Sequence, residues 1–169
     1  VRDEWKPLWG KRAVVEDHFN ELVIDLVNPA GQPERMQLVV RGYNDGFAFC
    51  YKIPDGEGPR VNVQSELTAY NFAGDYTAWF YNGENHNIGP EKLTETDGTR
   101  LPVMTVKAGD KHYMAIHEAC LETGAPLVLQ SKGGESLFSV ASKPTSLSPG
   151  YTSAWRVVLY GTTPVSYTH

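Results

Sequence analysis

The sequence predicts an all-β fold, a sandwich or barrel-like domain. Short apolar runs alternate with polar residues at period two, and Gly, Pro, Asn and Asp interrupt them about every 8–12 residues. Helical periodicity is weak throughout, and no tandem repeat points to a propeller or a solenoid. With 169 residues, of which 41% are hydrophobic, the chain has the size and composition of a single domain over residues 1–169.

Hairpins follow one another along the chain. Residues 21–27 alternate, with Leu22, Ile24 and Leu26 on one face. A second alternating run leads to Asp45-Gly46, a strong signal for a tight turn, so residues 34–53 are expected to form a hairpin. Further strands are expected at residues 61–63, 68–72, 76–81, 101–107, 111–118, 127–129, 137–140 and 151–160.

Two segments lack a regular pattern. Residues 5–12 are aromatic but contain Pro7 and Gly10, and we expect an irregular segment that lies over a core. Residues 82–100 are polar and show no periodicity, which predicts a long exposed loop. Loops of this length in compact domains are often functional.

Charge and cysteine content exclude several classes of protein. A net charge of −5 and a pI near 5.5 argue against a nucleic-acid partner, which requires a basic surface. No run of 18 apolar residues is present, so no membrane span is expected. Cys50 and Cys120 either form one disulfide or, the favoured interpretation, are small buried hydrophobes, and neither lies in a zinc-binding pattern.

Glu118 is the residue that most needs an explanation. It ends an apolar run, and strand alternation places it on the same face as Met114 and Ile116, while His117 lies on the opposite face. A carboxylate in phase with buried positions is costly unless it is paired, hydrogen-bonded or bound to a metal. The alternative is that the strand ends there and Glu118 is solvated.

Other candidate chemistry is weak. The histidines are scattered, and the many loop carboxylates are better explained as solvated surface than as a glycosidase pair. Residues 79–81, Trp-Phe-Tyr, form either a sugar-stacking platform or part of the core, and the core is favoured. The sequence therefore assigns no catalytic and no cofactor-binding residue.

Seven segments, taken together and in order, resemble one known family. They include the motif Ile-His-Glu-Ala at residues 116–119 and the segment Trp-Lys-Pro-Leu-Trp-Gly at residues 5–10. The seven segments are residues 5–12, 19–22, 41–49, 65–68, 75–79, 115–119 and 153–158. The chain is similar over essentially its whole length to the N-terminal domain of glycoside hydrolase family 97, the bacterial α-glucosidases and α-galactosidases.

This resemblance implies a β-super-sandwich of the galactose-mutarotase type that packs on a C-terminal (β/α)₈ catalytic barrel. The family's domain normally begins with further strands, and the barrel carries the catalytic residues, so we expect the chain to be a fragment of a larger enzyme. The resemblance also implies that Glu118 is a ligand of an active-site calcium ion, with the other ligands coming from the barrel. The isolated chain should then bind calcium poorly and hydrolyse no oligosaccharide substrate.

Two further functions remain as alternatives. A free-standing carbohydrate-binding module would need Trp79 or Trp155 to be exposed, and a mutarotase-like epimerase would need an acid and a base in one cleft, with His117 as a candidate. If the chain is a fragment, an exposed apolar interface should make the isolated chain self-associate. The family resemblance implies a periplasmic or secreted location.

Overall fold

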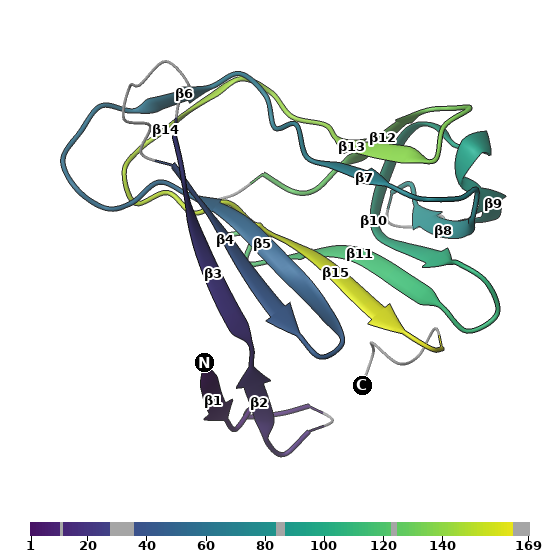
Figure 1. Cartoon of the computed structure of the whole chain (residues 1–169), viewed down its shortest axis with the longest axis horizontal. Helices are drawn as coiled ribbons and strands as arrows, with labels where there is room; N and C mark the ends of the chain where they lie inside the picture. Colours follow the sequence, from purple (N-terminus) through teal and green to yellow (C-terminus); the bar gives the residue numbers. More distant parts are fainter. Residues whose placement is uncertain (11, 28–35, 84–86, 123–124, 164–169) are drawn as a thin grey trace.

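The computed structural model contains fifteen short strands and one 3₁₀ turn among its described residues, which are 1–10, 12–27, 36–83, 87–122 and 125–163. The predicted all-β class is therefore confirmed. Most strands belong to one antiparallel sheet, which folds over on itself so that its two halves face each other (Figure 1). In the described part of the chain, no helix is long and apolar enough to cross a membrane.

The larger half of the sheet runs from an open edge at β3 to β9. Its strands, in spatial order, are β3 (Asn20–Leu26), β4 (Met36–Tyr43), β5 (Gly46–Lys52), β15 (Trp155–Gly161), β11 (Tyr113–Ala119), β10 (Asp97–Lys107), β8 (Thr77–Tyr81) and β9 (Asn87–Lys92). The β4–β5 hairpin closes at Tyr43 and Gly46, as the Asp-Gly turn predicts.

The smaller half begins where the long strand β10 bends away. The first residues of β10 pair with β12 (Leu129–Lys132), followed by β13 (Leu137–Val140) and β7 (Ala69–Asn71). A separate two-stranded ribbon, β6 (Val61–Val63) with β14 (Thr145–Leu147), continues this layer over β4 and β5 (Figure 1). β10 thus belongs to both layers of the sandwich.

The hydrophobic core fills the space between these two halves. Phe80 of β8 and Phe138 of β13 meet across it, with ring centroids 5.6 Å apart. The remaining buried members come from both layers: Ala78, Leu93, Met104, Val106, Ile116, Leu127, Leu129 and Val140. By contrast, Leu22, Val23 and Ile24 of β3 are exposed, so apolar side chains on both faces of this strand reach the surface.

The prediction of a long exposed loop at residues 82–100 is wrong for the part of this segment that the structure describes. β9 lies at Asn87–Lys92, a 3₁₀ turn η1 at Leu93–Glu95, and β10 begins at Asp97. The pair Gly89-Pro90 had indicated a turn, but Gly89 is needed because a side chain there would meet the carbonyl oxygen of Ala78, 2.5 Å from its Cβ, on the neighbouring strand. Residues 84–86 lie outside the described residues.

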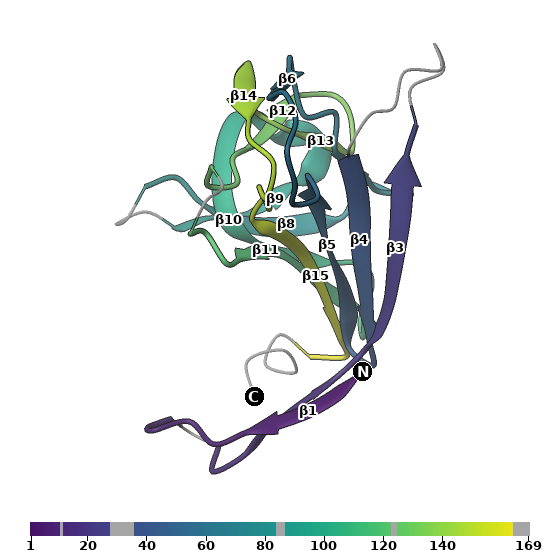
Figure 2. The ribbon, with the colours of Figure 1, turned by 90° about the vertical axis from the view of Figure 1, so that its left-hand side faces the viewer.

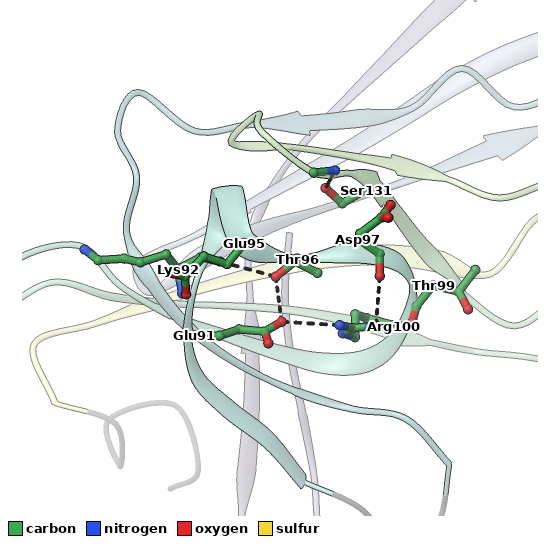
Figure 3. Close-up of polar contacts among 9 residues, drawn as sticks. Glu91, Lys92, Glu95, Thr96, Asp97, Thr99, Arg100 and Ser131 are labelled. Atoms are coloured by element: carbon green, nitrogen blue, oxygen red, sulfur yellow. Dashed lines mark hydrogen bonds and ion pairs between the residues drawn. The ribbon is translucent and has the colours of Figure 1, made fainter.

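Hydrogen bonds between polar side chains hold this segment together. Hydrophobic periodicity therefore did not predict β9 or the start of β10. The hydroxyl of the buried Thr96 donates to Glu91 Oε1 at 2.6 Å, and Arg100 Nη2 approaches the same oxygen at 3.4 Å (Figure 3). Arg100 Nη1 also donates to the carbonyl oxygens of Asp97 and Thr99. The Thr96 and Arg100 side chains converge on one oxygen of the Glu91 carboxylate and tie β9 to β10.

The N-terminal segment also differs from the expectation that it lies over a core. β1 (Arg2–Trp5) and β2 (Val15–His18) form a hairpin that projects from one end of the molecule (Figure 2). The aromatic residues in this hairpin are exposed, Trp9 at 88%. Pro7 and Gly10 lie in its turn rather than in a covering segment.

The two cysteines are both free. Cys50 is buried, as expected, and burial raises the pKa of its thiol. Cys120 is exposed, so the expectation that it is a buried hydrophobe is wrong. It follows the last residue of β11 and has a positive φ of 54°, which turns the chain away from the sheet and into solvent.

Candidate functional site

Glu118 lies at the penultimate position of β11, on the face of the strand that contributes to the core. It is half-buried, whereas the neighbouring His117 is exposed on the opposite face, as strand alternation predicts. Across the ladder Glu118 faces Arg156 of β15. The carboxylate therefore stands at the boundary between core and solvent.

A backbone hydrogen bond orients this carboxylate. The N–H of Leu127 donates to Glu118 Oε2 at 2.5 Å, and Leu127 is itself buried. The bond supplies an acceptor to an N–H that would otherwise lie unpaired in the core. An ionised carboxylate has about four lone-pair positions, so one accepted bond leaves Glu118 with acceptor capacity for a cation.

Arg156 is buried beside Glu118, at 4% exposure, and forms a two-pronged ion pair with Glu66. Its Nε and Nη2 donate to the two carboxylate oxygens of Glu66 at 3.1 and 2.7 Å. Burial lowers the pKa of Arg156, but the hydrogen bond and charge of Glu66 outweigh it, so the pKa is raised and the group stays cationic. Because Glu66 uses two of its donors, Arg156 does not fully neutralise Glu118 as well.

Tyr70 completes this polar cluster. Burial is the main cause that raises the pKa of Tyr70 to about 12; the charge of Arg156 lowers it and that of Glu66 raises it. Among the described residues, the buried side-chain atoms without a hydrogen-bond partner are the Tyr70 hydroxyl, Arg156 Nη1 and, outside this cluster, Arg100 Nε. Glu66, Glu118 and Arg156 together place two carboxylates and one guanidinium at this end of the core.

A cavity of about 900 Å³ opens beside the cluster. Glu66 and Arg156 line its polar side, and Tyr51 and Tyr151 contribute rings. The rest of its wall is largely apolar and comes from the β6–β14 ribbon, from the segment after β11 and from Met36. The polar cluster thus has access to a space outside the packed core.

Within the described residues, no group of three or more His, Cys, Asp or Glu side chains is arranged to hold a metal ion. Glu118 is therefore a single carboxylate, not part of a complete site. His112 is engaged elsewhere, with Nδ1 2.6 Å from the Tyr160 hydroxyl, while His86 and His169 lie outside the described residues. The described residues thus offer one oriented oxygen ligand in Glu118.

Comparison with protein families identifies the chain. The model described as "Glycosyl-hydrolase 97 N-terminal" matches residues 1–166. The chain belongs to this family. It is a glycoside hydrolase family 97 N-terminal domain, as the resemblance in the sequence implied. The matched residues include the whole cluster around Glu118.

A family 97 enzyme and a β-arabinopyranosidase of solved structure share the fold. A family 97 enzyme from Pseudoalteromonas sp. strain K8, solved with acarbose, superimposes with a TM-score of 0.79 at 23% identity, over 98% of this chain and 27% of that one. A variant of that enzyme with panose gives a TM-score of 0.81 at 22% identity, over 100% and 27%. A β-arabinopyranosidase gives 0.80 at 17% identity, over 96% and 30%.

This family 97 N-terminal domain therefore matches only a minor part of each of those enzymes. It spans about a quarter of their length, and at these identities the likeness establishes the fold alone. The expectation of an all-β N-terminal domain within a larger enzyme is confirmed.

The aromatic candidates of this family 97 domain do not form an open platform. Phe80 is buried in the core, as favoured, and Trp79 and Trp155 are both half-buried, but Tyr81 is exposed at 41%, so the core assignment is wrong for that residue. Arg41 covers the Trp155 ring, with its guanidinium carbon 4.6 Å from the ring centroid, and bonds Glu21 at 2.7 Å. A free-standing sugar-binding module therefore lacks the exposed Trp79 or Trp155 surface that it requires.

Sequence reasoning missed Glu66, Tyr70 and Arg156 as members of the cluster. Arg156 carried the same signal as Glu118, since it is a charged residue in phase with the apolar Val158 on a strand. Glu66 had no such signal because it lies outside the regular strands and reaches Arg156 from 90 residues away. Both lie in segments that carry the family resemblance, but their pairing requires the fold.

Proposed function

We propose that this chain is the non-catalytic N-terminal domain of a calcium-dependent α-glycosidase, an α-glucosidase or α-galactosidase. In this proposal the domain packs on a (β/α)₈ barrel of the same polypeptide and supplies Glu118 to the active-site calcium. The observation that carries the proposal is the position of Glu118, a half-buried carboxylate at the core boundary that a backbone N–H orients.

The residues present fit one ligand of a calcium site. Calcium takes six to eight oxygen ligands at about 2.3–2.6 Å, and carboxylates are its preferred protein ligands. Glu118 retains acceptor capacity for a cation, and among the described residues it is not part of a group of three or more His, Cys, Asp or Glu side chains that could hold a metal ion. In this proposal the remaining ligands come from the barrel.

The domain's own residues have a positioning task in this scheme. The Leu127 N–H fixes the rotation of the Glu118 carboxylate. The ion pair with Glu66 keeps Arg156, which lies opposite Glu118 on the neighbouring strand, positively charged and in place. A bound calcium ion would act as a Lewis acid toward a substrate oxygen. Acid, base or nucleophile would come from the barrel.

The proposed substrate is an oligosaccharide. The Pseudoalteromonas enzyme, 27% of which matches this chain, was solved with acarbose, and its variant was solved with panose. This supports a sugar substrate for the complete enzyme and not a binding function for the isolated domain. We also propose, from the family resemblance, that the enzyme is exported to the periplasm or secreted, which cell fractionation with an antibody against the chain tests.

Hydrolysis assays on the complete polypeptide test the proposed activity. We expect cleavage of aryl α-glucosides or α-galactosides, loss of activity with a chelator and recovery on addition of calcium. Glu118→Gln should lose at least about 10-fold in activity at limiting calcium, as ligand changes at metal sites commonly do. The matched control is Glu122→Gln, four residues along. Activity in the isolated chain, or equal activity of both variants, would refute the proposal.

A further inference from the structure

Arg156 has an unpaired hydrogen-bond donor beside a carboxylate that has acceptor capacity to spare. Its Nε and Nη2 both donate to Glu66, whereas its Nη1 is buried without a partner. Glu118 lies directly opposite Arg156 on the neighbouring strand β11 and accepts a hydrogen bond from the Leu127 N–H. Buried polar atoms in proteins are nearly always hydrogen-bonded, so the unpaired Nη1 requires an explanation.

The strand register favours an ion pair between Arg156 and Glu118. Residues directly opposite each other on antiparallel strands have Cβ atoms about 4.5–5.5 Å apart and point to the same face of the sheet. Arginine and glutamate side chains at this separation commonly form a two-pronged ion pair, in which the guanidinium donates two hydrogen bonds to the carboxylate. In the described structure, Arg156 instead makes these two bonds to Glu66.

Glu66 accounts for this choice of partner because it occupies the donating edge of the guanidinium. It reaches Arg156 from the segment between β6 and β7, in the smaller half of the sandwich, and its oxygens accept at 3.1 and 2.7 Å. A guanidinium donates in a fixed planar geometry, so two bonds to one carboxylate fix the direction of the third nitrogen. At 4% exposure of Arg156, solvent screens this pair little.

The arrangement bears directly on a cation at Glu118. A carboxylate that pairs with arginine gives up the lone pairs and the negative charge that attract a hard cation. While Glu66 holds the guanidinium, the Leu127 N–H occupies one acceptor position of Glu118 and the arginine occupies none. The pairing between Arg156 and Glu66 therefore keeps Glu118 in a form that suits a metal ligand.

We propose that Glu66 is a positioning residue that keeps the Arg156 guanidinium away from Glu118 and so leaves the Glu118 carboxylate available to a cation. The inference rests on the proposed function, because it takes Glu118 as a calcium ligand. It goes beyond that function by assigning a role to Glu66, which acts through Arg156 and not as a ligand itself. Loss of Glu66 should lower the affinity for calcium, and additional loss of Arg156 should restore it.

Titration calorimetry with calcium on the complete polypeptide tests this role. Glu66→Gln should bind calcium at least about 10-fold more weakly than the unaltered protein, a typical effect of changing a residue that supports a metal ligand. The double variant Glu66→Gln/Arg156→Met should recover the affinity, because the competing guanidinium is gone. The control is Glu91→Gln, which breaks the ion pair of a similarly buried glutamate with Arg100 on the far side of β10 and should leave calcium affinity unchanged.

The double variant separates positioning from a structural role. If Glu66 only stabilised the fold, the double variant would bind calcium no better than Glu66→Gln, and that result would overturn the inference. Arg156→Met alone provides the test if Glu66→Gln does not fold, since an apolar residue of similar length often replaces a buried charge without loss of stability. It should bind calcium at least as tightly as the unaltered protein, and weaker binding would count against the inference.

A crystal structure of Glu66→Gln without calcium gives a readout that does not depend on the metal. The Arg156 guanidinium should donate to Glu118 in this variant, and a guanidinium that keeps its present position would overturn the inference. If the unaltered polypeptide binds no calcium while Arg156 turns to Glu118 in the variant, the proposed function fails and the positioning role stands. If the unaltered protein and Glu66→Gln bind calcium equally well, the positioning role fails alone.

Discussion

Glu118 and Leu127 are coupled at the scale of single residues, since a buried N–H depends on the carboxylate. Replacing Glu118 by Ala removes that acceptor, and the unfolding free energy of the chain should fall by about 1–3 kcal/mol. Glu118→Gln keeps a carbonyl oxygen at the same reach and should cost less than about 1 kcal/mol. Urea denaturation of the two variants measures the difference, and equal losses would show that the bond does not matter.

Tyr70 gives a prediction of the pH dependence of stability. Burial raises its pKa to about 12 in the folded protein, from the ordinary tyrosine value of about 10. Between these values the unfolded chain releases the phenolic proton while the folded chain keeps it, so stability is complete below pH 10 and falls as the pH rises toward 12. The expected loss from this group is at most about 3 kcal/mol.

The variant Tyr70→Phe isolates this effect. At pH 7 it should leave stability unchanged or slightly higher, because the buried hydroxyl has no partner in the described structure. Between pH 10 and 12 it should lose less stability than the unaltered chain, as measured by urea denaturation across that range. An identical alkaline loss in both proteins would assign the effect to other tyrosines.

At the scale of elements, the β5–β15 pairing depends on the close approach of two backbones. A side chain at Gly46, the first residue of β5, would place its Cβ 2.2 Å from the carbonyl oxygen of Val158, whereas none of the structure lies within 4 Å of the corresponding atom at Gly42. Gly46→Ala should therefore lower the unfolding free energy by about 1–3 kcal/mol.

Gly42→Ala is the matched control, on the neighbouring strand β4. It should stay within about 1 kcal/mol of the unaltered chain or stabilise it, because Gly is unfavourable within a strand. Thermal denaturation of both variants gives the comparison. Equal stability of the two would contradict the described β5–β15 contact.

The elements also show what the sequence could and could not predict. The hairpins at β4–β5, β10–β11 and β12–β13 were predictable, because turn residues separate runs of alternating apolar residues. β9 was not, since its order comes from side-chain bonds such as Thr96 to Glu91 and from the fit of Gly89 against β8. The periodicity of apolar residues predicts which strands bury an apolar face. It does not predict strands whose polar side chains hydrogen-bond to one another.

The same distinction applies to the candidate site. Alternation placed Glu118 on the core face of its strand, and the structure confirms this. The acceptor role toward Leu127 and the Glu66–Arg156 pair depend on contacts across the fold. Alternation also placed Leu22 and Ile24 on one face of a strand, but both are exposed, because burial depends on a covering layer as well as on the pattern.

For the whole molecule, the open edge of the sheet predicts association of the isolated chain. β3 has a partner on one side only, and Leu22, Val23 and Ile24 along it are exposed. Unpaired apolar edges of this kind favour strand pairing between copies. Sedimentation velocity should show concentration-dependent oligomers that Ile24→Lys suppresses and the control Leu67→Lys does not. A chain that is monomeric at all concentrations would contradict this expectation.

We propose that the domain contributes one ligand, Glu118, to a calcium ion whose other ligands come from the barrel. Titration calorimetry with calcium, on the isolated chain, the complete polypeptide and its Glu118→Gln variant, tests this proposal. We expect poor binding by the isolated chain, tight binding by the complete polypeptide, and affinity at least about 10-fold lower in the variant. Equal affinities of the complete polypeptide and its Glu118→Gln variant would contradict it.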